Sequence, residues 1–467
     1  MSQIPVQVKH AGKSHELTLD TSAPFSAFKE QIYTVTGVPV DRMKIMLKGK
    51  GMLKDDTNWS KIAVKPAIVF TVIGAAGELP KPPEKQTVFL EDMDDEELAQ
   101  VALIPSGLRN LGNTCYMNAS LQALRAVPEL QEALSFSTGA DTFAMALNSL
   151  YTELRNTAST VTPMRFLQIL REVSYAEEAY SYMLNTLRSV RVPSSNLSVI
   201  EQYMKATVRR ELKSDEAPAE QPTVAIEEVM KLECHIGRET AYLNQGILNS
   251  FTSTLSKLSP TLGREATYTQ TSRLTRLPKY LNVHMVRFAW RADIAKKAKV
   301  MRQVKFPLVL DALEFVTPEL KEKLLPVNRK LTDVERERFE RRRTRGRTQQ
   351  AQGGTSEVEL RTAEKTALEA LVDPGIKNDL GASESGLFDL VAIVTHKGAA
   401  ADSGHYMGFV KQSVFRTAED AKDENDDWFK FDDDKVSVFP KDKIATLSGG
   451  GEDSAAYVLL YKSRQLE

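Results

Sequence analysis

The sequence has few cysteines and no long hydrophobic run, and both absences narrow the class of protein. Cys115 and Cys234 are the only cysteines among 467 residues. Two thiols are too few for a disulfide framework, and they lack the paired spacing of a zinc site. Apolar runs such as Ala67 to Ile73 fall far short of the roughly 20 residues that cross a bilayer. Met1 to Gln7 lacks the basic and hydrophobic character of a leader peptide. We therefore expect a soluble protein of a reducing compartment, with no membrane partner.

An excess of charge of either sign is also missing. Lys and Arg total 61 against 62 Asp and Glu, so the net charge is −1. With this balance the chain has no overall positive electrostatic field to attract nucleic acid, and we expect no specific nucleic-acid partner. Apolar residues make up 42% and charged residues 26% of the chain, which excludes collagen-like, mostly disordered and coiled-coil proteins. At roughly 150 residues per domain, the length allows about three domains, or two of which one is large.

Residues 1–75 have the pattern of a small α+β unit. Apolar residues alternate on both sides of a turn at Ala11-Gly12, which predicts a hairpin. A helix should follow, with Ser22 as its cap, Pro24 in its first turn and Gly37 as its stop. Two further strands are predicted at Met43 to Lys48 and Ala67 to Ile73. The order β-β-α-β-β resembles a ubiquitin-like β-grasp domain, here a built-in docking module or, alternatively, a structural cap.

Composition changes twice along the rest of the chain. Residues 76–105 are rich in proline and acidic residues, which predicts a linker. In residues 106–465, helical periodicity comes first and strand-like stretches gather later, so we expect α+β architecture. Asn328 to Arg347 carries nine basic and four acidic residues. We therefore expect residues 327–382 to be a largely disordered or loosely helical insertion. Its basic cluster suits RNA, an acidic partner or a nuclear import receptor, but is more typical of solvated surface.

Cys115 is placed where a thiol becomes nucleophilic. Gly112 and Asn113 suit a tight turn, and the apolar spacing after them predicts a helix that begins near Cys115 and ends before Pro128. The free N–H groups and the positive dipole end of a helix favour thiolate over thiol. A structural cysteine packed at a helix start is the alternative, and this segment alone does not separate the two.

A thiolate nucleophile also needs a proton acceptor, so the histidines have to be sorted. The pattern around His10, His15, His235 and His284 is typical of structural or exposed side chains, and His396 is a weak candidate. His405 is the strong one, because it begins a predicted strand directly after Gly404. If the following strand, which starts at Trp428, returns beside the first, an Asp near its end can hold the imidazole ring.

These residues carry a close resemblance to a known family. The chain is similar to the ubiquitin-specific proteases in ordered blocks that span some 350 residues. The blocks are Gly107 to Asn118, Gly404 to Tyr406, Trp428 to Val436 and Ala456 to Tyr461. The ubiquitin-like first domain, together with Thr87 to Met93 and Val127 to Leu130, narrows the resemblance to the proteasome-associated type.

The resemblance implies a papain-like cysteine-protease hand with a helical thumb from about Ser106 to Val192, a palm and extended fingers. Cys115 would be the nucleophile, His405 the general base and then acid, and Asp432 the residue that orients His405, with Asp433 as the fallback. Asn110 would donate its amide to the oxyanion. The implied reaction is hydrolysis of the isopeptide bond at the C-terminal glycine of ubiquitin, and it needs no metal or organic cofactor.

The same resemblance implies partners and a location. Ubiquitin and ubiquitinated proteins would be substrates, and residues 1–75 would dock on the proteasome regulatory particle, in the cytoplasm and nucleus. The family's Gln-Gln-Asp box is missing near Ser174 to Tyr180. A catalytically weak or inactive ubiquitin-binding regulator of the proteasome is therefore the alternative, and a redox-sensing thiol protein is a weaker one. Ala399 to Ser403 is a candidate for a loop that covers the cleft until docking.

Overall fold

A computed structural model describes residues 3–62, 64–74, 104–137, 141–173, 179–291, 296–345, 357–398, 404–416, 426–451 and 453–465. The chain divides into two units, Met1–Phe89 and Leu90–Glu467. Nearly all of the predicted linker 76–105 lies outside the described residues. In the part of the chain that is described, no helix is long and apolar enough to span a membrane.

The first unit is a β-grasp. Its sheet has the order β2-β1-β5-β3-β4, with β1 and β5 parallel and the other neighbours antiparallel. The strands are β1 (Gln3–His10), β2 (Lys13–Asp20), β3 (Lys44–Leu47), β4 (Gly51–Leu53) and β5 (Ile68–Ile73). Helix α1 (Phe25–Thr36) buries Phe25, Phe28 and Ile32, and Phe28 packs edge-on against Phe70 of the sheet. The expected fold class of this unit is confirmed.

One local expectation in this unit is wrong, and one strand was not predicted. The residue before α1 is Pro24 and not Ser22, whose hydroxyl donates to Asp20 instead. The strand predicted at Met43 to Lys48 is present as β3. Gly49 and Gly51 then adopt positive φ values of 86° and 77° and reverse the chain into β4, which the pattern did not indicate. The turn at Ala11-Gly12 and the glycine stop at Gly37 are confirmed, since both glycines have positive φ.

Helices form the first part of the second unit, the thumb of the hand. They are α3 (Cys115–Leu124), α4 (Pro128–Ser135), α5 (Thr142–Asn156), α6 (Met164–Val173), α7 (Ala179–Thr186) and α8 (Val199–Tyr203). The amphipathic stripe of α5 buries Phe143, Leu147, Leu150 and Leu154, as their spacing predicts. Helix α3 is buried on nearly every side, including its polar residues Asn118, Ser120 and Gln122.

The palm is a mixed sheet of the order β18-β17-β16-β15-β19-β11-β8, with β14 paired to β15. Its strands are β8 (Leu232–His235), β11 (Tyr280–Val286), β14 (Val309–Asp311), β15 (Leu387–Lys397), β16 (His405–Lys411), β17 (Trp428–Asp432), β18 (Lys435–Phe439) and β19 (Ala455–Ser463). A short hairpin, β12 (Phe288–Arg291) and β13 (Lys296–Lys299), follows β11. Strand β15 lies inside the sheet and is buried along almost its whole length, which fits the apolar run from Leu390 to Val394.

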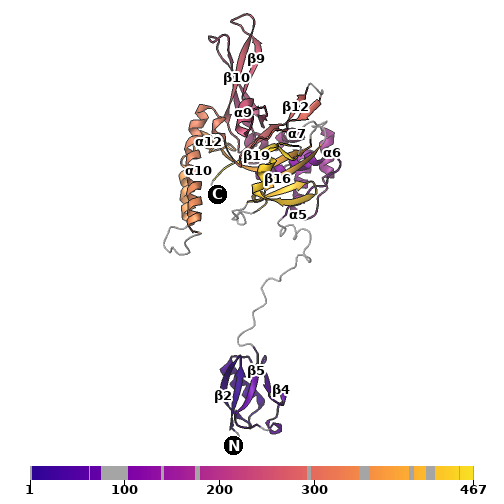
Figure 1. Cartoon of the computed structure of the whole chain (residues 1–467), viewed down its shortest axis with the longest axis vertical. Helices are drawn as coiled ribbons and strands as arrows, with labels where there is room; N and C mark the ends of the chain where they lie inside the picture. The colour runs from indigo at the N-terminus through magenta and orange to yellow at the C-terminus, as the bar shows by residue number, and fades with distance from the viewer. Residues whose placement is uncertain are drawn as a thin grey trace. The chain divides into compact units, whose positions relative to one another are not determined.

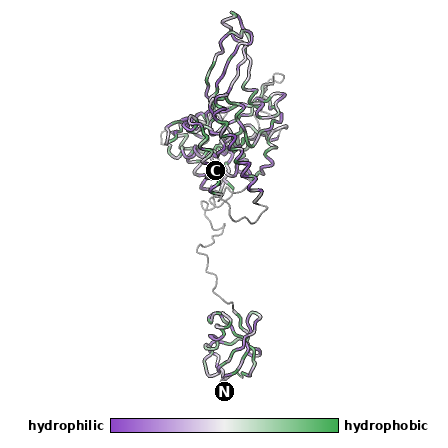
Figure 2. Tube along the Cα trace, turned by 90° about the vertical axis from the view of Figure 1, so that its left-hand side faces the viewer, coloured by the Kyte–Doolittle hydropathy of each residue, from purple (hydrophilic) through white to green (hydrophobic). Residues whose placement is uncertain are grey.

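The fingers are a separate antiparallel sheet of the order β7-β6-β10-β9, and β9 and β10 extend away from the rest of the unit (Figure 1). The strands are β6 (Ala206–Ser214), β7 (Thr223–Val229), β9 (Thr252–Leu258) and β10 (Glu265–Arg276), and helix α9 (Leu243–Ser250) precedes β9. Hydrophobic and hydrophilic residues are mixed along these strands (Figure 2), which suits a sheet with large exposed faces.

The insertion at 327–382, expected to be largely disordered or loosely helical, is helical in its described part, but it is packed and not loose. Helix α10 (Pro318–Arg345) is long (Figure 1), α11 (Glu357–Glu369) folds against it, and the short α12 (Pro374–Lys377) follows. Val327, Leu331 and Val334 form a buried stripe of helical spacing and share a small core with Leu368, Val372 and Leu387. The many charged residues between these positions made the apolar stripe hard to recognise in the sequence. Part of the charge is also paired internally, because Arg338 and Arg341 both bind Glu364.

Candidate active site

The helix that starts at Cys115 and the strand that starts at His405 lie against each other. A Cβ at Gly408 of β16 would lie 3.1 Å from the carbonyl oxygen of Ala119 in α3, so the two backbones approach closely there. The rings of Tyr116 and Tyr406 meet edge-on, with centroids 4.6 Å apart. Cys115 and His405 directly precede these tyrosines, so the two elements begin at the same end of the contact. The Cys115 side chain is largely buried there, with the residue 8% exposed.

His405 is held by a carboxylate from the neighbouring strand. Strands β16 and β17 pair antiparallel, and the Nε2 atom of His405 lies 2.6 Å from Oδ1 of Asp432. The second carboxylate oxygen of Asp432 lies 3.0 Å from Nζ of Lys430. Burial by itself would raise the pKa of Asp432, but the hydrogen bonds from His405 and Lys430 outweigh it, and its pKa is lowered. The carboxylate is therefore ionised at neutral pH and holds Nε2–H, which leaves Nδ1 of His405 as the proton acceptor.

Asp433 takes a different place from Asp432. Its side chain accepts from Nδ2 of Asn110 and from Nδ2 of Asn118, each at 2.8 Å. Its carbonyl oxygen accepts from the N–H of Leu108 at 2.9 Å. Asp433 has a φ of 55° in the turn between β17 and β18, a left-handed conformation that Asp tolerates better than most residues. This residue therefore ties the turn to the segment that leads into α3.

Asn110 organises the loop before Cys115. Its Oδ1 atom accepts from the N–H of Gly112 at 2.9 Å and from the N–H of Thr114 at 3.3 Å. Gly112 and Asn113 have positive φ, so the predicted tight turn before the helix is confirmed. The amide nitrogen of Asn110 carries two hydrogens, and one of them goes to Asp433.

A cluster of aromatic rings packs beside these residues. Tyr457 of β19 packs against Tyr406 at 5.8 Å and against Tyr116 at 6.3 Å between ring centroids. His396 packs against Tyr406 at 4.7 Å, and Phe288 against both His396 and Tyr457. Burial raises the pKa of Tyr406 to about 12, and the nearby Cys115 adds to this effect, so its phenol stays neutral. His396, the weak candidate, is thus a member of this ring cluster.

The second cysteine, Cys234, is in an unreactive environment. Cys234 of β8 is completely buried, and burial raises the pKa of its thiol to about 12. A Cβ at Gly246 would lie 2.2 Å from its sulfur, so α9 packs directly on this thiol. Since the thiolate is the reactive form, Cys234 has the properties of a small core residue. Among the described residues, no cluster of His, Cys, Asp and Glu is arranged to hold a metal ion.

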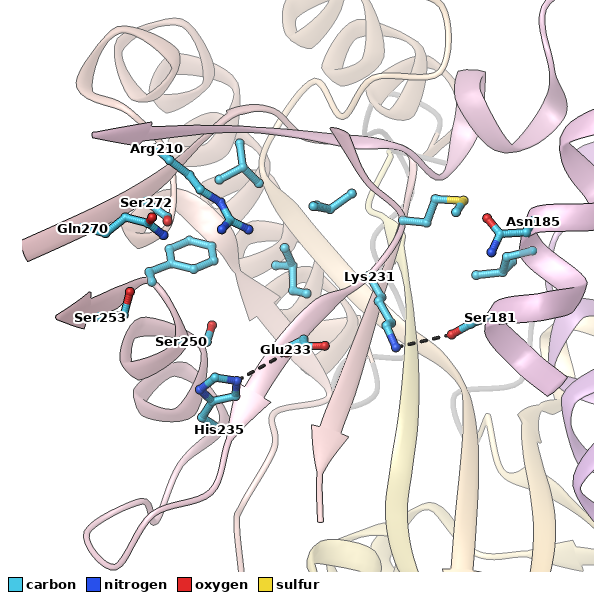
Figure 3. A pocket seen from close by; sticks show the side chains of 16 residues that line it. Ser181, Asn185, Arg210, Lys231, Glu233, His235, Ser250, Ser253, Gln270 and Ser272 are labelled. Atoms are coloured by element: carbon cyan, nitrogen blue, oxygen red, sulfur yellow. Dashed lines mark hydrogen bonds and ion pairs between the residues drawn. The ribbon is translucent and has the colours of Figure 1, made fainter. Parts of the chain in front are cut away.

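A pocket of about 650 Å³ lies where the thumb, the palm and the base of the fingers meet. Figure 3 shows Arg210 and Gln270 on the finger strands and Lys231 and Glu233 at the palm side. Nζ of Lys231 lies 3.3 Å from Oγ of Ser181 in α7, which joins the palm side of the pocket to the thumb. The lining is mixed polar and apolar, as suits the surface of a folded partner rather than a small apolar ligand.

The comparison with known sequences identifies the class of protein. Residues 106–461 match the ubiquitin carboxyl-terminal hydrolase family, and residues 6–74 match the ubiquitin family. The chain belongs to the ubiquitin carboxyl-terminal hydrolase family. The resemblance drawn from the sequence motifs is thus confirmed, and so is the enzyme class, a cysteine-type deubiquitinase.

Similarity to curated hydrolases of this family extends over almost the whole chain. It is 40% identical to ubiquitin carboxyl-terminal hydrolase 6 of Schizosaccharomyces pombe, with 99% of each chain covered. It is 36% identical to ubiquitin carboxyl-terminal hydrolase 6 of Arabidopsis thaliana, with 96% of each covered. Identity to ubiquitin carboxyl-terminal hydrolase 14 of Caenorhabditis elegans is 31%, over 99% of this chain and 94% of the relative.

Sequence reasoning missed several residues of this hydrolase's site. Lys430 precedes Asp432 by two positions on one strand and therefore lies on the same face, a spacing that was available to find it. The hydrogen bond from Asn118 to Asp433 could not be predicted, because it joins residues 315 positions apart in the sequence. The candidate loop Ala399 to Ser403 and most of the altered box near Ser174 lie outside the described residues.

Proposed function

We propose that this chain hydrolyses the isopeptide bond between the C-terminal glycine of ubiquitin and a lysine, by a thiol mechanism. The observation that carries the proposal is the hydrogen bond of 2.6 Å between His405 and Asp432 at the start of a strand that packs on the Cys115 helix. A buried thiol at a helix start, an imidazole and an ionised carboxylate that orients it are the groups that such chemistry requires.

The reaction proceeds in two halves. In the first, His405 takes the proton of the Cys115 thiol, and the thiolate attacks the glycine carbonyl and forms an S–C bond. His405 then gives this proton to the departing lysine amine as the C–N bond breaks. In the second, His405 takes a proton from water, the hydroxide adds to the thioester, and the S–C bond breaks to release ubiquitin. Asp432 keeps the imidazole in the productive tautomer through both halves.

Charge on the tetrahedral oxygen is stabilised by the loop before the helix. The Cys115 N–H belongs to the first turn of α3, where backbone donors have no carbonyl four residues back. Asn110 lies in the same loop, and its second amide hydrogen adds a donor. Loss of one preorganised donor of this kind costs about 3 kcal/mol in related acyl-transfer chemistry.

The proposal is tested by covalent capture. Ubiquitin that carries a C-terminal electrophile should label the full chain once, at Cys115, and should not label Cys115→Ala. The matched control is Cys234→Ala, which should label like wild type because Cys234 is buried in the core. No labelling of wild type, alone or with purified proteasomes, would support the alternative of a non-catalytic ubiquitin-binding regulator.

We further infer that the pocket at the base of the fingers contacts the folded body of ubiquitin, and that residues 1–75 dock on the proteasome regulatory particle. The docking proposal is supported by the match to the ubiquitin family and by an exposed apolar pair. Met46 and Met52 lie opposite each other on β3 and β4 and are 39% and 54% exposed. Action on proteasome-bound chains would place the protein in the cytoplasm and nucleus.

Docking is tested with the full chain carrying Met46→Asp and Met52→Asp. Both substitutions are on the surface, so the domain should stay folded while co-sedimentation with purified proteasomes is lost. Tyr33→Asp, an exposed site on α1, is the control and should bind normally. Equal binding by all variants would remove this docking surface, and imaging of a tagged full chain checks the location.

A further inference from the structure

Arg287 is a fully buried cation beside the aromatic cluster. It joins β11 to β12 and is 1% exposed. Its guanidinium donates from Nε to the carbonyl oxygen of Ala456 at 2.7 Å, from Nη1 to that of Arg302 at 2.9 Å and from Nη2 to that of Ser448 at 2.9 Å. Among the described residues, its partners are main-chain carbonyls and not a carboxylate. Burying a guanidinium is costly, and carbonyl dipoles from separate segments offset that cost only while those segments stay in place.

The turn after Ser448 is built around this guanidinium. Gly449 has a φ of 89°, and a Cβ on it would lie 2.9 Å from Nη1 of Arg287. Only glycine therefore allows the turn to approach so closely. The N–H of Val304 also donates to the Ser448 carbonyl, which fixes the same turn from the side of the chain that leaves β13.

A second buried cation acts on the same segments. Lys299 ends β13 and is 7% exposed. Its Nζ donates to the carbonyl oxygen of His396, at the end of β15, at 2.9 Å and to that of Asp453 at 3.3 Å. Lys299 pairs directly with Phe288 across the β12–β13 hairpin. The two cations together join this hairpin, Ser448, Asp453 and the end of β15.

The joined segments carry the rings that approach the catalytic residues. Phe288 from the hairpin packs on His396 at 5.2 Å and on Tyr457 at 6.0 Å. Tyr457 in turn contacts Tyr116 and Tyr406, the neighbours of Cys115 and His405. A shift of the hairpin would therefore be passed through Phe288 and Tyr457 to the two tyrosines that follow Cys115 and His405 in the sequence.

We infer that Arg287 and Lys299 are positioning residues that hold the β12–β13 hairpin as a wall of the cleft for the ubiquitin tail. This inference rests on the proposed function, because it assigns the cleft to that tail. The cations touch neither the thiol nor the imidazole. Their loss should therefore weaken the binding of the tail while the intrinsic reactivity of Cys115 is kept.

The experiment uses the full chain with Arg287→Lys, Arg287→Met and Lys299→Met. Ubiquitin with a C-terminal fluorogenic amide gives KM and kcat, and alkylation by iodoacetamide gives the reactivity of Cys115. Because the hairpin would contact the tail equally in the ground state and the transition state, its displacement should raise KM, by roughly 10-fold, and leave kcat nearly unchanged. Alkylation of Cys115 should stay at the wild-type rate, and amide exchange over residues 288–291 and 296–299 should become faster.

Arg464→Met is the matched control. Arg464 is also largely buried, but it pairs with Asp389 near the other end of β15, roughly 23 Å along the strand from His396. This variant should lose stability with an unchanged KM. An unchanged KM in Arg287→Lys and Lys299→Met, or an equal rise of KM in Arg464→Met, would overturn the inference. A wild-type chain that does not cleave the substrate would instead contradict the proposed function. If Arg287→Met does not fold, the other two variants still decide.

Discussion

Replacement of Asp432 by alanine removes the group that holds His405. The bond between Nε2 of His405 and Oδ1 of Asp432 is 2.6 Å long, and a hydrogen bond to a charged group contributes about 1.5–3 kcal/mol. The side chains are 36% and 34% exposed, so solvent screening favours the lower end of this range. About 1.4 kcal/mol corresponds to a tenfold change in rate. We therefore expect Asp432→Ala to lower kcat roughly 10-fold.

Asp432→Asn separates orientation from charge. An amide oxygen at the same position still accepts from Nε2–H, so the tautomer and ring orientation are kept, and Cys-His-Asn sites use this arrangement. The negative charge that stabilises the imidazolium is lost, and so is the ion pair with Lys430. The expected decrease in kcat is roughly threefold, smaller than for alanine.

Steady-state cleavage of a fluorogenic ubiquitin amide measures both variants, with the concentration of active thiol fixed by titration with a ubiquitin electrophile. Asp433→Ala is measured beside them. The assignment is refuted if Asp432→Ala keeps the wild-type kcat while Asp433→Ala loses it, since the orienting carboxylate would then be Asp433.

Other consequences can be measured separately. Asp433→Ala leaves Asn118, which is 2% exposed, without its carboxylate partner and forces alanine to a φ of 55°. Unfolding in urea should therefore show a free energy of unfolding about 2–3 kcal/mol lower than in wild type. An unchanged unfolding midpoint would contradict the proposed link between this turn and the segment before α3. Ser253→Trp on an exposed finger strand should fill the pocket and raise KM for ubiquitin substrates roughly 10-fold or more, with alkylation of Cys115 unchanged; a normal KM would remove the pocket from the binding surface. Because burial raises the pKa of Cys234 to about 12, its thiolate is scarce at pH 9 and increases only as the pH approaches 12, so mass spectrometry after iodoacetamide treatment at pH 7–9 should find Cys115 modified and Cys234 intact.

The parts of the site that depend on neighbouring residues could be predicted from the sequence. A glycine-asparagine turn followed by helical spacing places Cys115 at a helix start, and a glycine before an alternating apolar stretch places His405 at a strand start. Both are short-range properties. The selection of Asp432 over Asp433 depends on the register of β16 and β17, and only the family resemblance ordered the two.

Features that depend on residues far apart in the sequence could not be predicted or were predicted wrongly. The partners of Arg287 are backbone carbonyls, which every residue has, so no sequence pattern marks them. The α10–α11 element was misread because its charges were counted as solvated. Its buried stripe, Val327, Leu331 and Val334, has ordinary helical spacing and was a signal that the sequence did contain.

The most direct measurement of the central claim is single-turnover cleavage of diubiquitin by the full chain, quenched in acid and examined by mass spectrometry. The account predicts a thioester between ubiquitin and Cys115 in wild type, no thioester in Cys115→Ala, and thioester formation at least about 100-fold slower in His405→Ala. Cleavage that persists in Cys115→Ala, or a thioester that forms at the normal rate without His405, would contradict it.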